Sequence, residues 1–387
     1  MKGAFLYVKA GKGHFIPAKA LADAMISLGH EAVTDDFFSI IGAEKYGAMS
    51  ETSWRFMLAH PKIDLIVEHS QDKKSDGNLA EFLANTAHHQ ETLKRWCDKN
   101  HPDFILCTHF LGATILPDML EKCGISIPVY AYASDLFNSV KPAYNPKLSL
   151  YYVPTEIGRR NIIEGGMLKE KTVLCPFPLQ QSIAKLRGKG KEEARERLSL
   201  ADTFTILLNL GGEGIGNIDI LKKVAKTHPS WQVIIAGDPD KNLSAKEKSF
   251  RKEFPDFRLV TPGFTNEIGW YILASDLQMG KAGANSLMES LALHRPFLLS
   301  TVLYGALGTK KFLEGNHVGW VEENEKRQLE ILDGVAQGNA PTEEAFNALP
   351  VRFSAEEFAK RIICDTEYLR LAKKTKESKQ ESPKAPL

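Results

Sequence analysis

Short apolar runs alternate with longer amphipathic segments along the first half of the chain. Residues 4–8 are β-prone and end at a glycine-rich turn, and residues 17–28 have the spacing of a helix that Gly29 closes. Strands that alternate with helices predict parallel β-α units. Further strands of this half are expected over residues 104–108, 129–133 and 148–153, with a helix over residues 111–120.

The alternation stops near Pro176 and then starts again. A polar, flexible stretch over residues 185–191 follows, and a new strand over residues 204–209 leads into a second glycine-rich turn. We therefore predict an α/β fold with two doubly wound Rossmann-like domains, residues 1–178 and 179–352, that face a cleft. Further strands of this half are expected over residues 231–236, 276–279, 297–300 and 318–321.

The composition indicates a folded protein without a strong charge bias. Hydrophobic residues make up 43% of the 387 residues and charged residues 25%, which is ordinary for a globular chain. Lys and Arg number 49 and Asp and Glu 48, so the overall charge does not favour nucleic acid as a partner. The five cysteines form no Cys-x-x-Cys pair, and no apolar run approaches the roughly 18–20 residues that cross a bilayer. We expect a soluble, cytoplasmic protein.

The first glycine-rich turn, Gly11-Lys12-Gly13-His14, is suited to a ligand. Glycines let the backbone turn sharply and approach a bound molecule, and the helix that follows presents free N–H groups. His14 is expected at the mouth of the cleft, where an imidazole can act as a base at neutral pH. The same residues also suit an ordinary tight turn before a helix.

The second glycine-rich turn, over residues 211–216, has glycines at four of its six positions, among them Gly211, Gly212 and Gly214. Such a loop between a strand and a helix suits a phosphate group. It is not a Walker A loop, because no Gly-Lys-Ser/Thr follows, and no acidic residue is well placed for a Rossmann ribose. The alternative is a glycine-rich connection without a ligand.

A third motif runs from Lys281 to Glu289 and reads Lys-Ala-Gly-Ala-Asn-Ser-Leu-Met-Glu. Its small residues precede a helix whose start can hold a diphosphate, and Glu289 can accept hydrogen bonds from two ribose hydroxyls. Ser286 and Glu289 also have the spacing of a capping box, which would use the carboxylate only to satisfy the helix end.

A fourth segment, Pro262-Gly263-Phe264, follows a strand expected over residues 258–260. It can offer backbone hydrogen bonds and a flat aromatic face to a nucleotide base. Taken alone, it is only a turn.

Together these motifs resemble glycosyltransferases of the GT-B fold, in the group that contains MurG, the monogalactosyldiacylglycerol synthases and the processive diacylglycerol glucosyltransferases. The first turn is similar to the Gly-x-Gly-His of the diacylglycerol enzymes, and residues 207–216 are similar to the loop that opens their second domain. The third motif is similar to their Lys-x-Gly-Gly-x-Thr-x-x-Glu donor motif, with Ala284 and Ser286 as departures. The resemblance spans residues 2 to 320, with the motifs in the family's order.

The resemblance implies an inverting transfer of a hexose from a UDP-sugar to a diacylglycerol-type lipid, with no cofactor and no bound metal. It implies that His14 is the base. His109 and Asp135, which fall where the family has a Pro-Asp strand and a Thr-Asp turn, are the other catalytic candidates. Asp238 and Asp240 form an Asp-x-Asp pattern, which we reject as a metal motif because a solvated loop is expected after that strand. The acceptor is expected at Gly11, Gly13 and His14, and the donor at Gly211, Gly212, Gly214, Gly263, Phe264, Lys281, Gly283, Ala284, Asn285, Ser286, Glu289, Ala306 and Leu307.

The chain departs from the family after the strand expected over residues 297–300. These enzymes carry Gly-Gln-Glu-x-x-Asn there to contact the donor sugar, whereas this chain has Ala306 and Leu307 in place of Gln and Glu. Because lost hydrogen-bonding groups forfeit recognition, we expect an altered or relaxed donor preference. The alternatives are a UDP-sugar 2-epimerase and a noncatalytic nucleotide-sugar-binding protein on the same scaffold.

A lipid acceptor requires contact with a membrane surface. Residues 53–67 mix aromatic, aliphatic and cationic side chains that can lie in the membrane interface, although they also suit a core helix. The helix within residues 353–372 is expected to pack back on the first domain, and the lysine-rich residues 373–387 are expected to be disordered. We expect the protein in the cytoplasm and peripheral on the inner face of the cell membrane.

Overall fold

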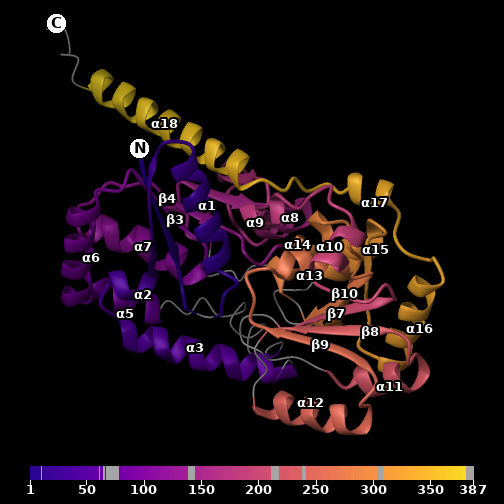
Figure 1. Cartoon of the computed structure of the whole chain (residues 1–387). Helices are drawn as coiled ribbons and strands as arrows, with labels where there is room; N and C mark the ends of the chain where they lie inside the picture. The colour runs from indigo at the N-terminus through magenta and orange to yellow at the C-terminus, as the bar shows by residue number, and fades with distance from the viewer. Residues whose placement is uncertain are drawn as a thin grey trace, which may run out of the picture.

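The computed structural model describes residues 1–9, 11–60, 62–63, 66, 78–137, 144–210, 218–237, 241–281, 283–302 and 308–380 (Figure 1). Two six-stranded sheets, one from each half of the chain, organise this part of the protein. All neighbouring strands within them pair in parallel. The predicted α/β class with two Rossmann-like domains is therefore confirmed.

The first sheet belongs to the N-terminal half. Its strands are β1 (Lys2–Tyr7), β2 (Glu31–Asp36), β3 (Phe104–Cys107), β4 (Val129–Tyr132), β5 (Leu150–Val153) and β6 (Thr172–Leu174), in the spatial order β2-β1-β3-β4-β5-β6. The sequence did not predict β2 or β6, which are the two edge strands and bury fewer side chains than the central ones. The helices of this half are α1 (Phe15–Ser27), α2 (Phe37–Ile40), α3 (Glu44–Ala59), α5 (Asn78–Asn85), α6 (Ala87–Asn100), α7 (Phe110–Lys122) and α8 (Glu156–Glu164), with a 3-10 turn, η2 (Lys169–Lys171).

The second sheet repeats this plan. Its strands are β7 (Thr205–Asn209), β8 (Gln232–Ala236), β9 (Arg258–Gly263), β10 (Leu277–Lys281), β11 (Phe297–Thr301) and β12 (Gly319–Val321), in the order β12-β11-β10-β7-β8-β9. Each of these strands overlaps one that the sequence predicts. The helices are α9 (Gln181–Ala184), α10 (Lys191–Arg197), α11 (Ile220–Thr227), α12 (Lys241–Glu253), α13 (Ile268–Ala274), α14 (Ala284–Ala292), α15 (Thr309–Gly315), α16 (Glu325–Ala336) and α17 (Glu343–Asn347).

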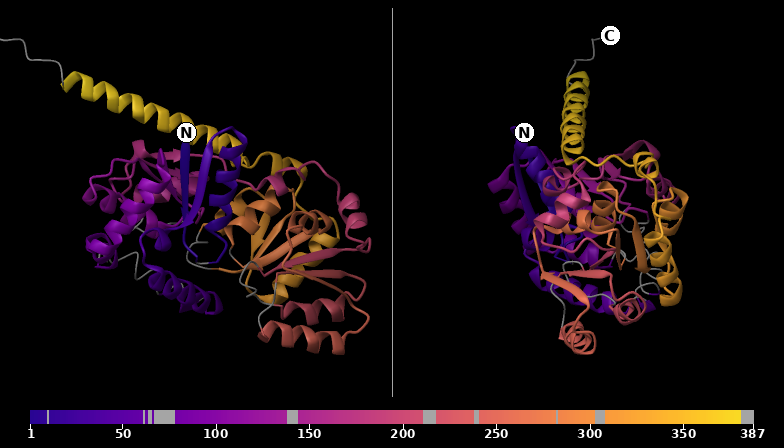
Figure 2. Two further views of the ribbon diagram at one scale, coloured as in Figure 1. Left: turned by 60° about the vertical axis from the view of Figure 1, so that its left-hand side comes forward. Right: turned by 45° about the vertical axis from the view of Figure 1, so that its right-hand side comes forward.

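Helices cover both faces of each sheet (Figure 2). Every side chain of β3 and of β8 is buried, as expected for parallel strands with helices on both sides. Two separate apolar clusters lie on the first sheet and two on the second, so each domain has its own core.

The chain crosses between the domains twice at one place. Phe177 donates its N–H to Arg352 O at 2.7 Å, and Ser354 donates its N–H to Phe177 O at 3.0 Å. The second crossing leads into α18 (Ala355–Gln380), which packs on α1 and buries Phe358 and Ile362 against the first sheet. The two crossing segments are thus paired like neighbouring strands.

Side-chain hydrogen bonds also hold α18 to the first domain. Tyr130 and Thr366 share a hydrogen bond of 2.9 Å, and the Tyr152 hydroxyl donates to Asp365 Oδ2 at 2.8 Å. The helix continues to Gln380, past Lys373, where we expected disorder to begin, and its end projects from the body of the molecule (Figure 2). Among the described residues, no helix is both long enough and apolar enough to cross a bilayer.

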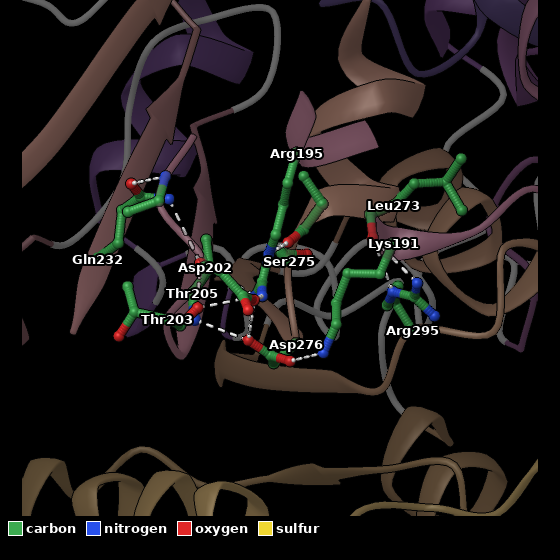
Figure 3. Close-up of polar contacts among 12 residues, drawn as sticks. Lys191, Arg195, Asp202, Thr203, Thr205, Gln232, Leu273, Ser275, Asp276 and Arg295 are labelled. Atoms are coloured by element: carbon green, nitrogen blue, oxygen red, sulfur yellow. Dashed lines mark hydrogen bonds and ion pairs between the residues drawn. The ribbon is translucent and has the colours of Figure 1, made fainter. Parts of the chain in front are cut away.

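An ion cluster fastens the amino ends of the strands in the second sheet (Figure 3). Arg195 of α10 is buried and pairs with Asp276 Oδ2 at 2.9 Å, while Lys191 Nζ lies 2.7 Å from Asp276 Oδ1. Asp276 Oδ2 also accepts the N–H of Thr205 at 2.8 Å, which ties the start of β7 to the start of β10. A buried ion pair is tolerated when further hydrogen bonds satisfy it, so we assign this cluster a structural role.

Candidate functional site

A pocket of about 540 Å³ lies between the carboxyl ends of the two sheets. Its walls come from segments that follow β1, β4, β7, β8, β9 and β10 and from the first two turns of α14. The order of strands reverses between β1 and β3 and between β7 and β10, and such switch points are where open α/β sheets bind ligands. The lining residues are Gly11, Lys12, Gly13, His14, Phe15, Ile16, Trp54, Ser134, Asp135, Gln180, Ser182, Asn209, Ala236, Gly237, Phe264, Thr265, Asn266, Ile268, Lys281, Gly283, Ala284, Asn285, Ser286 and Glu289.

Two hydrogen bonds to Thr108 fix His14 beside the end of β3. His14 Nδ1 donates to Thr108 O at 2.8 Å, and Thr108 Oγ1 donates to His14 O at 2.8 Å. A carbonyl oxygen can only accept, so Nδ1 carries the proton and Nε2 is the acceptor of the neutral ring. Gly11, with a φ of 71°, provides the left-handed turn that the loop from β1 to α1 needs. The arrangement suits a base in the pocket wall.

His109 lies behind His14, in a different environment. The two ring centroids are 4.4 Å apart, and His109 Nδ1 accepts the N–H of Leu111 at 3.2 Å, which caps α7. Burial holds the pKa of His109 well below its usual range, and His14 lowers it further. His109 lines a much smaller cavity, of about 10 Å³, between β3 and β4. His109 is therefore a buried histidine that is hydrogen-bonded at the end of β3.

Asp135 follows β4 and lines the same pocket as His14. Asp135 is exposed to solvent. Even so, desolvation by the protein around the carboxyl raises the pKa of Asp135, while the charge of His14 lowers that pKa. Asp135 therefore places a carboxyl group beside His14 in the pocket wall.

Glu289 is the buried acid of the second domain. It is only 5% exposed, and its Oε1 accepts a hydrogen bond from Gln180 Nε2 at 2.9 Å. Burial raises the pKa of Glu289 to about 7, and the Gln180 bond opposes that rise. The N-cap of α14 is Gly283 rather than Ser286, and no side chain caps the helix. The capping-box interpretation is therefore wrong: Glu289 lies in the second turn and bonds to the segment between the domains.

Five further residues of the third motif also line the pocket, namely Lys281, Gly283, Ala284, Asn285 and Ser286. Ser286 Oγ accepts a hydrogen bond from Asn209 Nδ2 at 3.1 Å, which joins α14 to the end of β7. Asn285 Nδ2 donates to Gly13 O at 3.0 Å, so this helix start contacts the first domain directly. Lys12 reaches across in the same way, with Nζ 3.5 Å from the centre of the Phe264 ring. The first turn, the third motif and the fourth segment thus meet in one place.

Some residues discussed in the sequence analysis, including the rejected Asp-x-Asp pattern, lie outside the described part of the chain. These are Gly211, Gly212, Gly214, Asp238, Asp240, Ala306 and Leu307. Gly263 is described and ends β9 with a φ of 70°, next to the lining residue Phe264. Across the residues that the structure does describe, no three His, Cys, Asp or Glu side chains converge to form a metal site.

Several lining residues were not among our sequence candidates. Ser134, Asn209 and Gly237 follow or end strands, a position from which they could have been suspected. The sequence gives no sign that Gln180 and Trp54 line the pocket, because neither follows a strand. Gln180 belongs to the segment between the domains, and Trp54 belongs to α3.

No family model and no curated protein sequence matches this chain, but solved structures do. UDP-GlcNAc 2-epimerase from Neisseria meningitidis, bound to UDP-GlcNAc, is 13% identical with a TM-score of 0.60, over 94% of this chain and 99% of that one. Alr3699/HepE of Anabaena, in complex with UDP and glucose, is 12% identical with a TM-score of 0.56, over 94% and 98%. A glycosyltransferase from Rickettsia africae ESF-5 is 13% identical with a TM-score of 0.57, over 95% and 98%.

The fold is GT-B. This confirms the fold that the sequence motifs suggested, over nearly the whole chain. At 12–13% identity the likeness concerns the fold alone, and GT-B proteins include both transferases and epimerases.

Proposed function

We propose that this GT-B protein is a UDP-sugar-dependent glycosyltransferase that moves a hexose, with inversion, to a diacylglycerol-type lipid. The observation that carries the proposal is the presence of His14 and Glu289 in one pocket between the two sheets. His14 supplies a base from the first domain, and Glu289 supplies a buried acceptor for the ribose hydroxyls from the second. The solved GT-B proteins in complex with UDP and glucose, or with UDP-GlcNAc, support a UDP-sugar as the ligand class.

These positions support the following reaction. The acceptor hydroxyl oxygen forms a bond to the anomeric carbon while the bond from that carbon to the UDP oxygen breaks. The hydroxyl proton moves to His14 Nε2, and a nearby Asp135 carboxylate stabilises the imidazolium. The diphosphate leaves towards the N–H groups at the start of α14, whose first turn contains no acidic residue.

The lipid part of the proposal rests on the exposed apolar side chains of α3 and the residues after it. Met49 and Phe56 lie seven residues apart, on one face of the helix, and are 67% and 52% exposed. Ile63 and Ile66 follow, 39% and 71% exposed. Exposed apolar side chains along this segment support an interaction surface, and a bilayer interface fits their chemistry.

Product analysis tests the proposal. We expect purified protein, incubated with a panel of UDP-hexoses and vesicles that contain diacylglycerol, to form a hexosyl lipid and UDP in equal amounts. Variants with Ala306→Gln and Leu307→Glu in the same panel test whether these positions set donor choice. Conversion of UDP-GlcNAc to its 2-epimer without an acceptor would favour the epimerase alternative, and UDP binding without any product would favour a noncatalytic binder.

Vesicle sedimentation tests the lipid surface separately. We expect Met49→Ser/Phe56→Ser to weaken binding to vesicles at least tenfold, because a buried side chain of this size contributes about 1.5–3 kcal/mol. UDP affinity should not change. Ile26→Ser, which removes a 54% exposed isoleucine from α1, is the matched control. If the double variant sediments like the wild type, α3 is not the membrane contact.

A further inference from the structure

Gln180 bonds to the buried acid of the second domain, and the proposed reaction assigns it no role. Its Nε2 donates to Glu289 Oε1 at 2.9 Å. Gln180 is half-buried and lines the pocket together with Glu289. In the part of the chain that the structure describes, no other group bonds to this carboxylate, so Oε2 is left for a ligand.

The backbone on either side of Gln180 is fixed in the same core as α14. Leu179 and Ile183 are each 1% exposed. Both belong to the apolar cluster that also contains Met288 of α14. The carbonyl oxygen of Gln180 accepts the N–H of Ile183 at 3.0 Å. The amide and the carboxylate are therefore carried on one packed unit, which holds them in a fixed geometry.

The direction of this hydrogen bond favours the charged form of the acid. An amide N–H can only donate, and an ionised carboxylate accepts at both of its oxygens. A protonated carboxyl donates from one oxygen, so it offers a ligand a donor where the ionised form offers an acceptor. Burial raises the pKa of Glu289 to about 7, and the bond from Gln180 opposes that rise. Without the amide, a larger share of the acid would be protonated at neutral pH.

Other charges in the pocket do not take over this task. Among the described residues, the pocket walls carry four other charged or titratable side chains, namely Lys12, His14, Asp135 and Lys281. They come from the loop after β1, from the end of β4 and from β10. None of them is a cause of the shift in the pKa of Glu289, which burial raises and Gln180 lowers. Gln180 is thus the described group that offsets the cost of ionising this acid.

We propose that Gln180 is a positioning residue for the nucleoside, which keeps the Glu289 carboxylate ready to accept the ribose hydroxyls. The proposal rests on the proposed function, since it takes the nucleoside of a UDP-sugar as the ligand of Glu289. The amide donates to Oε1, and the hydroxyls donate to the lone pairs that remain. Gln180 does not have to touch the ligand. A residue of the segment between the domains therefore sets the pH at which nucleoside binding is lost.

Uridine titrations of the full chain between pH 5 and pH 8.5 test the proposal. Wild-type affinity should fall to half of its maximum near pH 7, as the acid becomes protonated. Gln180→Leu should raise this midpoint by about 1 to 1.5 pH units, because it removes a hydrogen bond to a charged group. Uridine binding then weakens about 5- to 15-fold at pH 7, but only about twofold or less at pH 8.5. Gln180→Lys should lower the midpoint below that of the wild type, because a nearby ammonium favours the carboxylate.

The two substitutions distinguish positioning from a general effect on packing. A loss of packing would weaken uridine binding by the same factor at every pH, and it would not shift the midpoint in opposite directions. Gln328→Leu is the matched control. Gln328 is 3% exposed, its Nε2 donates to the Glu322 carbonyl oxygen at 2.7 Å, and it does not line the pocket. This change should lower the melting temperature and leave the pH profile of uridine binding unchanged.

The outcomes also separate this proposal from the one on which it rests. If the wild type binds uridine with a midpoint near pH 7 and neither Gln180 variant moves it, the positioning role is wrong and the proposed function is untouched. A wild-type affinity that stays constant from pH 5 to pH 8.5 would remove Glu289 from the ribose site, and Gln180 with it. If the wild type binds neither uridine nor UDP, the proposed function fails, and the role of Gln180 fails too.

Discussion

His14→Ala is expected to lower turnover about 10²- to 10⁴-fold, the usual contribution of a general base, while UDP affinity changes less than about threefold. The reason is geometric. Thr108 holds Nδ1 in the donor role at 2.8 Å, so Nε2 is the atom that receives the acceptor's proton. Ground-state binding of UDP does not use that atom. Steady-state kinetics with the preferred donor, together with UDP titration, measure both quantities.

His89→Ala is the matched control for this experiment. His89 is a buried histidine of α6 whose Nδ1 also donates to a backbone carbonyl at 2.8 Å, in this case Ile41 O. It lies away from the pocket, so its loss should lower stability and leave turnover per folded molecule unchanged. If His14→Ala retains full turnover, Asp135 becomes the leading candidate for the base.

Glu289→Gln is expected to weaken uridine binding at pH 8 by about 100-fold or more. A carboxylate can accept from two ribose hydroxyls, and each such charge-assisted bond contributes roughly 1.5–3 kcal/mol. The amide keeps the shape and can still accept from Gln180, so the change tests charge rather than packing. Uridine is a better ligand than UDP for this test. It has no phosphate, so the ligand itself does not titrate between pH 5 and 8.

The same substitution should stabilise the free protein at high pH. Burial raises the pKa of Glu289 from 4.5 to about 7, so the folded state disfavours the ionised form. Below about pH 4.5 the acid is neutral in both states and the penalty is absent. It grows as pH rises towards 7 and is constant above that, where Glu289→Gln should gain about 1–3 kcal/mol of unfolding free energy.

Uridine titrations and thermal unfolding at pH 5 and pH 8 check both effects. Wild-type affinity for uridine should fall as pH decreases through 7, because the carboxylate becomes protonated, and the Gln variant should lack this dependence. Glu330→Gln, on the exposed face of α16, should alter neither property. Equal uridine affinity of wild type and Glu289→Gln would exclude the ribose role.

The elements that could be predicted from the sequence are those whose signal is local. Strands such as β3 and β8 are buried on both faces and therefore read as continuous apolar runs. The edge strand β2 reads Glu-Ala-Val-Thr-Asp-Asp and, among the described strands, pairs with β1 alone, so its apolar signal is weak. The stretch over residues 185–191 looked flexible because it is polar, but Leu186 within it is buried in the core of the second domain.

The pocket was predictable only in part, because only some of its residues belong to a local sequence pattern. Glycine-rich turns after strands mark the carboxyl edge of a parallel sheet, so their neighbours His14 and Lys281 could be placed there. Whether Glu289 caps the helix depends on where α14 begins, and its start after Gly283 is set by the end of β10. The bond from Gln180 to Glu289 depends on how the two domains meet, which no local pattern records.

The return of α18 to the first domain sets the order in which the chain can be completed during synthesis. Phe358 and Ile362 fill a surface that also contains Phe5, Leu21 and Tyr152, and these two residues leave the ribosome after every strand of both sheets. The second domain can therefore close its core while the first still exposes aromatic side chains. A chain released before residue 355 would carry that apolar surface permanently, as a target for chaperones and proteases rather than as a working half of the protein.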